Sequence, residues 1–129
     1  MRGLLLLAGG GALAVLLTGC SSASGPDVSG VASAFEDPSG NAQARCDLLA
    51  PATRATLESD ASAPCADAIA DVQLPGGQVS KVEVWGGDAQ VRLGGDTVFL
   101  TQTDAGWKVT AAGCQSHGEA PYDCEVDGP

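Results

Sequence analysis

Cysteine is the residue type whose number and spacing carry the most chemistry in this chain. The 129 residues include five cysteines, which are Cys20, Cys46, Cys65, Cys114 and Cys124. No two of them are separated by only two to four residues, as the cysteine pairs of zinc sites usually are, so the sequence predicts no metal site. An odd number is unusual for an exported protein stabilised by disulfides. One cysteine therefore needs a role of its own.

The first twenty residues suggest that role for Cys20. Arg2 gives a positive start, and apolar runs follow over residues 4–8 and 12–17, which is the pattern of a secretory signal. These runs are shorter than the roughly 20 apolar residues of a membrane-spanning helix, and three glycines interrupt them. An ordinary signal with an incidental cysteine is the alternative interpretation.

The sequence Leu17-Thr18-Gly19-Cys20 resembles the bacterial lipobox, in which the cysteine thiol is acylated and becomes the first residue of the mature chain. The resemblance implies a signal peptide over residues 1–19, lipidation at Cys20 and an acylated flexible tether over residues 20–26. It also implies that the chain meets the membrane through its lipid, on the extracytoplasmic face.

Lipidation of Cys20 leaves an even set of four cysteines, and such a set outside the cytoplasm favours disulfides. Four cysteines allow three pairings, and proximity in the sequence favours Cys46–Cys65 and Cys114–Cys124. Cys46 and Cys65 also fall on the apolar faces of two predicted helices. A bond between them would join those helices from the inside, which supports this pairing over the crossed ones.

Few other residues are candidates for catalysis. His117 is the single imidazole, and it is predicted to be a solvated residue of the loop between Cys114 and Cys124. Tyr122 and Asp123, beside Cys124, form the other polar candidate pair. The chain has no nucleophile elbow, zinc-protease motif, phosphate-binding loop or dinucleotide fingerprint. The sequence therefore assigns no catalytic residue and no cofactor. A small enzyme that uses His117, Tyr122 or Asp123 is the rival hypothesis.

The charge of the chain is strongly negative, at −10. Removal of residues 1–19 would take away Arg2 alone and leave sixteen acids against five bases, a net charge of −11. Nucleic-acid binding needs clustered lysines and arginines, so we expect no nucleic-acid partner. Most acids are scattered, which is typical of a solubilising surface. Residues 119–127 concentrate them, and weak binding of a cation or basic partner there is an alternative.

The first half of the chain has helical periodicity. Val28, Val31, Ala32 and Phe35 recur at the spacing of one helix face, in a helix that Asp27 would begin. A second helix is predicted over residues 42–49, capped by Ser39 or Asn41, and Pro51 either ends it or opens a further turn. A third helix is predicted from Pro64, with one apolar face formed by Cys65, Ala68, Ile69 and Val72.

The second half alternates apolar and polar residues in four segments, near residues 80–84, 89–93, 97–101 and 107–111. Glycine-rich turns separate them, which is typical of antiparallel hairpins. The tail from Cys114 to Cys124 is predicted to be a small loop. The sequence thus predicts a single α+β domain over residues 27–129, with three N-terminal helices packed on a curved four-stranded antiparallel meander.

This order of elements resembles the cystatin-like cone of nuclear-transport-factor-2-like and SnoaL-like domains. The stretches CDLLAPATR (46–54), VEVWGGDAQVR (82–92), DTVFL (96–100), GWKVTAAGC (106–114) and PYDC (121–124) resemble a group of actinobacterial lipoproteins with no agreed activity. The cone implies a pocket between helices and sheet. Its candidate lining residues are the scarce large rings Phe35, Trp85, Phe99 and Trp107.

The chain departs from the isomerases and dehydratases of the cone fold, which place an Asp, His or Tyr in the pocket. The inward strand positions here are Val, Ala, Leu and Trp. We therefore expect a membrane-anchored lipoprotein with a small non-catalytic binding or interaction domain, whose partner is a small apolar ligand or an envelope protein. The alternatives are a small enzyme of the isomerase or dehydratase type and a purely structural envelope lipoprotein.

Overall fold

The structure is a computed structural model that describes residues 24–129. The predicted signal peptide, Cys20 and the first part of the predicted tether lie outside the described residues. Within residues 24–129, no helix has both the length and the apolar composition needed to cross a membrane.

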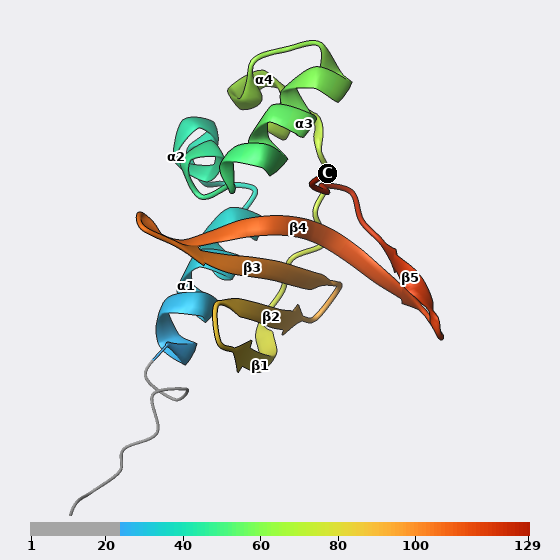
Figure 1. Cartoon of the computed structure of the whole chain (residues 1–129). Coiled ribbons are helices and arrows are strands. Elements are labelled where there is room, and N and C mark those ends of the chain that lie inside the picture. The colour runs from blue at the N-terminus through green and yellow to red at the C-terminus, as the bar shows by residue number, and fades with distance from the viewer. Residues whose placement is uncertain (1–23) are drawn as a thin grey trace, which may run out of the picture.

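Four helices precede the sheet (Figure 1). They are α1 (Gly25–Glu36), α2 (Ala42–Asp47), α3 (Pro51–Ala61) and α4 (Cys65–Asp71). The helix α1 begins two residues before the predicted Asp27, with Ser24 at its N-cap. Its apolar face is buried as the periodicity predicts, because Val28, Ala32 and Phe35 have no exposed surface.

The helices of the described chain number four rather than the predicted three, because Pro51 begins α3. Proline suits the first position of a helix, where its missing N–H would have no partner within the helix. The caps of α2 follow the prediction, since the side chain of Asn41 accepts a hydrogen bond from the N–H of Ala44 at 3.0 Å. The helix α4 begins at Cys65, directly after Pro64.

The sheet is an open antiparallel meander in the order β1-β2-β3-β4-β5. The strands are β1 (Val79–Trp85), β2 (Asp88–Leu93), β3 (Thr97–Thr103), β4 (Gly106–His117) and β5 (Ala120–Asp123). The first four occupy the predicted positions. The sequence predicted a loop after Cys114, but β4 continues to His117 and β5 returns beside it, so the described sheet has five strands rather than four.

One face of the sheet is covered by α1, which contacts β1, β2, β3 and β4. The core fills the space between them, and its inward strand residues include Val91, Val98, Leu100 and Val109. The helices α2, α3 and α4 gather at the β4 edge, where Ala50 N–H donates to the carbonyl of Val109 at 2.8 Å. None of the four described helices covers the opposite face, which we call the outer face.

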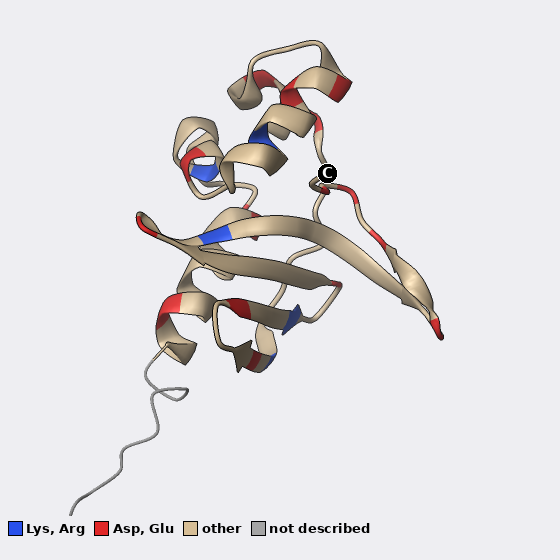
Figure 2. Cartoon of the chain, in the orientation of Figure 1, with Lys and Arg blue, Asp and Glu red and all other residues tan. Residues whose placement is uncertain are grey.

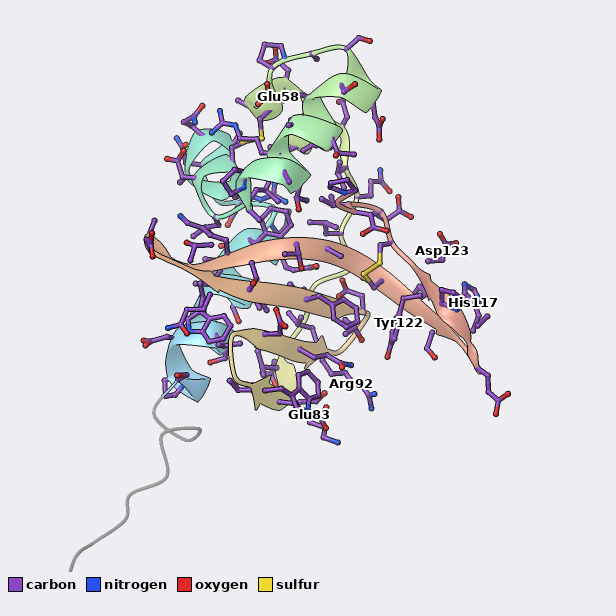
Figure 3. The ribbon with its side chains drawn as sticks, viewed as in Figure 1. Glu58, Glu83, Arg92, His117, Tyr122 and Asp123 are labelled. Carbon is purple, nitrogen blue, oxygen red and sulfur yellow. A yellow bond between two sulfur atoms is a disulfide. The ribbon has the colours of Figure 1, made fainter. Side chains whose placement is uncertain are left out.

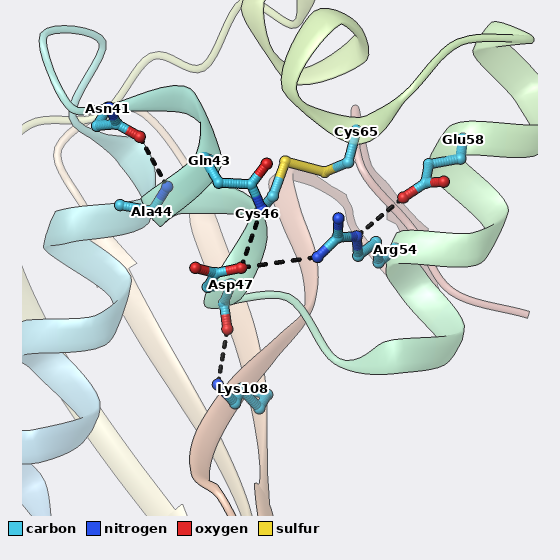
Figure 4. Close-up of polar contacts among 9 residues, drawn as sticks. All are labelled: Asn41, Gln43, Ala44, Cys46, Asp47, Arg54, Glu58, Cys65 and Lys108. Carbon is cyan, nitrogen blue, oxygen red and sulfur yellow. Dashed lines mark hydrogen bonds and ion pairs between the residues drawn. A yellow bond between two sulfur atoms is a disulfide. The ribbon is translucent and has the colours of Figure 1, made fainter.

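Two disulfides join the pairs that proximity in the sequence favours. Cys46–Cys65 links α2 to α4, and Cys114–Cys124 links β4 to the residue after β5. Polar contacts surround the first bond (Figure 4). The side chain of Arg54 bridges Asp47 and Glu58, and Lys108 Nζ donates to the carbonyl of Asp47 at 2.6 Å, which ties α2 to β4.

The Cys46–Cys65 bond should contribute a large share of the stability of this small domain. Replacement of both cysteines by alanine is expected to lower the free energy of unfolding by about 3 kcal/mol, because the unfolded chain regains the entropy of a closed loop of this size. Urea unfolding measures the change. The matched control replaces Cys114 and Cys124 by alanine, which opens a shorter loop and should cost less. An equal or larger loss for the control would contradict this ranking.

Candidate functional site

The structure does not bring the four predicted pocket rings together. Phe35 is fully buried and Trp107 is 8% exposed, and both belong to the core between α1 and the sheet. Trp85 and Phe99 lie on the outer face, because side chains alternate along a strand and their neighbours Val84 and Val98 point inward. Core side chains therefore occupy the space that the prediction assigned to a pocket lined by all four rings.

The outer face carries a hollow of about 380 Å³, which we call the ring hollow. The rings of Phe99 and Tyr122 meet edge to face in its wall, with centroids 5.1 Å apart. The hydroxyl of Tyr122 also accepts a hydrogen bond from Gln90 Nε2 at 3.4 Å. The full lining is Phe99, Thr110, Ala111, Tyr122, Cys124, Asp127, Gly128 and Pro129.

The C-terminal segment forms one wall of the ring hollow because two contacts hold it against β4. One is the Cys114–Cys124 disulfide, and the other is the backbone pairing of Ala112 with Val126, at 2.9 and 3.0 Å. Tyr122 also borders a second hollow of about 210 Å³, lined in part by Arg92 and Gln115. The tyrosine ring thus stands between the two hollows of the outer face.

The other polar candidates lie at the tip of the β4–β5 hairpin (Figure 3). His117 Nε2 is 3.9 Å from Asp123 Oδ2, and the two side chains are 56% and 84% exposed. Tyr122 is adjacent to Asp123 in β5, so its ring lies on the other side of the strand and contacts Phe99. The structure therefore leaves His117 and Asp123 solvated and does not unite them with Tyr122.

Sequence reasoning missed a buried pair of carboxyl groups, Glu36 and Asp96. Glu36 ends α1 and is 2% exposed, and Asp96 precedes β3 and is 5% exposed. Glu36 Oε2 accepts a hydrogen bond from the N–H of Gly76 at 3.0 Å. Glu36 Oε1 and both carboxylate oxygens of Asp96 are buried without a donor among residues 24–129. The two groups lie within hydrogen-bonding reach of each other.

Glycines close the structure over this pair. The segment from Pro75 to Gly77 crosses the turn between β2 and β3, and the N–H of Gly95 donates to the carbonyl of Gly76 at 3.1 Å. A side chain at Gly95 would collide with Pro75, and Gly77 has a φ of +111° and approaches the backbone of Gly94. We call this contact of 75–77 with 94–95 the glycine seal. Its closeness requires residues without a Cβ.

The pKa of Glu36 is raised from 4.5 to about 8, chiefly by burial and in smaller part by the hydrogen bond to Asp96 and the nearby charge of that group. The backbone N–H groups of Gly76 and Gly113 oppose this rise. Glu36 therefore keeps its proton at neutral pH, and its hydroxyl can donate to one oxygen of Asp96. A proton held between two carboxyl groups lessens their repulsion where no cation lies beside them.

A role in holding the fold together suits this pair better than contact with a substrate. Glu36 borders two hollows of about 180 and 310 Å³ on the helix side, but its Oε1 is buried and its Oε2 is bonded to Gly76. The pair instead lies where the end of α1 meets the turn before β3. Gly76 and Gly113 add the linker before β1 and a bulge of β4 to the same contact.

A signal for Glu36 exists in the sequence. With Val28, Ala32 and Phe35, it completes the spacing i, i+4, i+7 and i+8 of one helix face, so it falls on the buried side. An acid in the last turn of a helix also opposes the helix dipole, which marks it as unusual. Asp96 gives no such signal, because Gly94-Gly95-Asp96 has the composition of an ordinary hairpin turn.

Comparisons of the chain with protein-family models, with curated proteins and with solved structures find no match. Within residues 24–129, no three metal-ligating side chains gather closely enough to suggest a metal centre.

The carboxyl pair predicts a distinctive pH dependence. The pKa of Glu36 in the folded chain is raised, so its stabilising contribution is complete below pH 4.5 and is lost as the pH rises towards 8. Glu36→Gln cannot release a proton and keeps a donor for Asp96. Relative to this variant, the free energy of unfolding of the parent should fall with a slope approaching 1.4 kcal/mol per pH unit.

Urea unfolding at intervals from pH 4.5 to 9 measures this difference. Asp37→Asn is the matched control, because Asp37 is exposed and its pKa is lowered by hydrogen bonds from Ser39, so it titrates below this range. The control should keep the slope of the parent. Parallel profiles for the parent and Glu36→Gln would show that Glu36 is already ionised at neutral pH.

Proposed function

We propose that this chain is an extracytoplasmic lipoprotein, anchored through Cys20, whose domain binds a small apolar ligand without catalysis. The observation that supports ligand binding is the ring hollow. Its volume of about 380 Å³ lies in the range of small-molecule sites, and aromatic edges and the Ala111 methyl share its lining with Thr110 and Asp127. Such a mixture suits a ligand with an apolar body and one or two polar groups.

The disulfides support the extracytoplasmic half of the proposal. Four of the five cysteines are joined in pairs, and such bonds persist in oxidising compartments and are rare in the cytosol. The fifth is Cys20, at the end of the lipobox-like sequence. The acids of the described chain are spread over its helices, strands and turns (Figure 2). That distribution fits a domain that stays soluble at a surface.

We also propose that the domain is a short form of the cystatin-like cone. Helices that precede an antiparallel meander, with α1 laid across one sheet face, support this relationship. In this chain the core between α1 and the sheet is filled, and the ring hollow lies on the opposite face. The binding site would then differ in position from the pocket that the cone resemblance implies.

Binding is favoured over catalysis because the polar candidates are either exposed or enclosed. The His117–Asp123 contact is open to solvent at a hairpin tip, and the Glu36–Asp96 oxygens are buried under the glycine seal. An isomerase or dehydratase needs an acid or base that touches its substrate. An enzyme that uses Tyr122 in the ring hollow is the rival, and Tyr122→Phe distinguishes it. That substitution would abolish turnover by such an enzyme but would leave an apolar ligand bound.

Anchoring is tested at Cys20. Cys20→Ser is expected to lose incorporation of radiolabelled palmitate and to move from the membrane fraction to the soluble or uncleaved precursor fraction, because no thiol remains to be acylated. The matched control is Ser21→Ala, which should keep the label and stay in the membrane fraction. A Cys20→Ser chain that is still processed and membrane-bound would disprove the lipid anchor.

The ring hollow is tested with ligand that co-purifies from the native membrane, detected by native mass spectrometry. Phe99→Ala should weaken ligand binding about tenfold, a loss of about 1.4 kcal/mol, because the variant lacks one of the two aromatic rings that line the hollow. Trp85→Ala is the matched control, because Trp85 lies on the same sheet face outside the hollow. Equal loss in both variants, or a parent that never carries a ligand, would count against the proposed site.

A further inference from the structure

The strand β1 leaves one edge of the sheet open. It is the first strand in the sheet order, and apart from β2 and α1 no described element makes substantial contact with it. In Figure 1 it lies on the side of the sheet away from α2, α3 and α4. An open edge presents unpaired backbone N–H and C=O groups, which can pair with another strand.

The two ends of the sheet differ in how they prevent such pairing. β5 has only four residues, contains Pro121 and is followed directly by a disulfide, so it is a poor template for a further strand. β1 has seven residues and no proline, and its pairing with β2 is regular from Lys81 to Trp85, after a shift in register between Val79 and Lys81. Proteins usually blunt an edge of this kind with proline, bulges or charged side chains. In β1 the irregular register lies at the start of the strand, and the regular part carries two charges of opposite sign, on Lys81 and Glu83.

These charges are arranged so that β1 complements a second copy of itself. Val82 is the middle residue of Val79–Trp85, so the antiparallel register with the greatest overlap has a two-fold axis at Val82. That register places Lys81 of each copy directly opposite Glu83 of the other, on the same sheet face. Opposite charges in such cross-strand pairs are stabilising. Registers centred on Lys81 or Glu83 would instead bring like charges together.

The same register accounts for the exposed tryptophan. Trp85 is 54% exposed and is the one large apolar side chain of the described residues that is so open to solvent. In the register centred on Val82, Trp85 of one copy lies diagonally across from Lys81 of the other. Diagonal neighbours remain within reach of aromatic and long side chains, and an ammonium over an indole ring is favourable. The partly buried Val82 would also meet its own copy on the inward face.

We propose that two copies of this chain associate through β1, antiparallel and centred on Val82, into one continuous ten-stranded sheet. The partner is a second copy because β1 can pair with another β1 over its full length. That pairing places Lys81 opposite Glu83 and brings Trp85 diagonally across from Lys81. This inference does not depend on the ring hollow or on the lipid anchor. It concerns an edge of the sheet that neither of them occupies.

Charge reversal provides a sharp test. The measurement is native mass spectrometry of the full chain released from detergent, in which the parent should be a dimer. The single variants Lys81→Glu and Glu83→Lys should each dimerise at least about tenfold more weakly. The double variant Lys81→Glu/Glu83→Lys restores both cross-strand pairs and should dimerise like the parent. A mixture of the two single variants should form a heterodimer, because one edge is then all negative and the other all positive.

Folding is not expected to change in these variants. The Lys81–Glu83 contact within one chain is at the surface, with side chains 58% and 37% exposed, and such pairs contribute little to stability. Equal thermal unfolding of all four chains, measured at a dilution at which each is monomeric, checks this point. Asp104→Lys, at the turn between β3 and β4, is the matched control for a change of two charges and should leave the dimer intact. A monomeric parent, or single variants that dimerise like the parent, would overturn the proposal.

The register has a separate readout. Copies labelled with ¹⁴N and ¹⁵N are mixed and treated with a carbodiimide, which joins a lysine and a carboxylate as an amide with loss of water. Mixed-isotope peptides that join Lys81 of one copy to Glu83 of the other are the expected product. Mixed-isotope bonds formed only through Lys108, the other lysine of the chain, would overturn pairing through β1.

Discussion

The buried pair of carboxyl groups Glu36 and Asp96 is the constraint that the surrounding elements of this domain share. It lies where the end of α1, the linker before β1, the turn between β2 and β3, and the Gly113 bulge of β4 meet. Two adjacent carboxylates without a cation could not both be charged in such a place. Burial under the glycine seal excludes water from the pair and raises the pKa of Glu36. The proton that Glu36 then keeps removes the repulsion between two carboxylates.

The disulfides solve a second problem, which is the small size of the core. A domain of about 100 residues buries a limited apolar surface, and covalent links compensate by restricting the unfolded chain. The first bond fixes the short helix α2, which has six residues, to α4. The second holds the C-terminal segment beside β4, where it forms a wall of the ring hollow. The Cys114–Cys124 bond thus contributes both to the stability of the domain and to the shape of the candidate binding surface.

The two faces of the sheet have separate roles. The inner face is filled by α1 and the core, so the rings of Phe35 and Trp107 contribute packing rather than binding. The outer face keeps Phe99, Tyr122 and Trp85 at least partly open to solvent. Phe99 and Tyr122 frame a hollow of ligand size, while Trp85 lies on the edge strand that complements a second copy. Ligand binding and self-association can coexist because they use different parts of the outer surface.

Local sequence patterns determined much of this fold. Periodicities of 3.6 and 2 located the first helix and the first four strands, Asn41 was one of two predicted caps for α2, and proximity favoured the disulfide pairs that the structure contains. Pro51 was ambiguous because proline can follow one helix or begin the next. The strand β5 was missed because pairing after Cys114 depends on a partner strand rather than on alternation.

The tertiary structure alone decided which rings share a face and which polar groups meet. Trp85 and Phe99 belong to the outer face because of their phase relative to inward neighbours, and Tyr122 reaches Phe99 only because β5 folds back beside β4. Glu36 and Asp96 are 60 residues apart in the sequence, and nothing local to either one indicates the other. Their encounter is a consequence of how the linker and the β2–β3 turn pack, since a shared proton requires two groups that only the folded chain brings within reach.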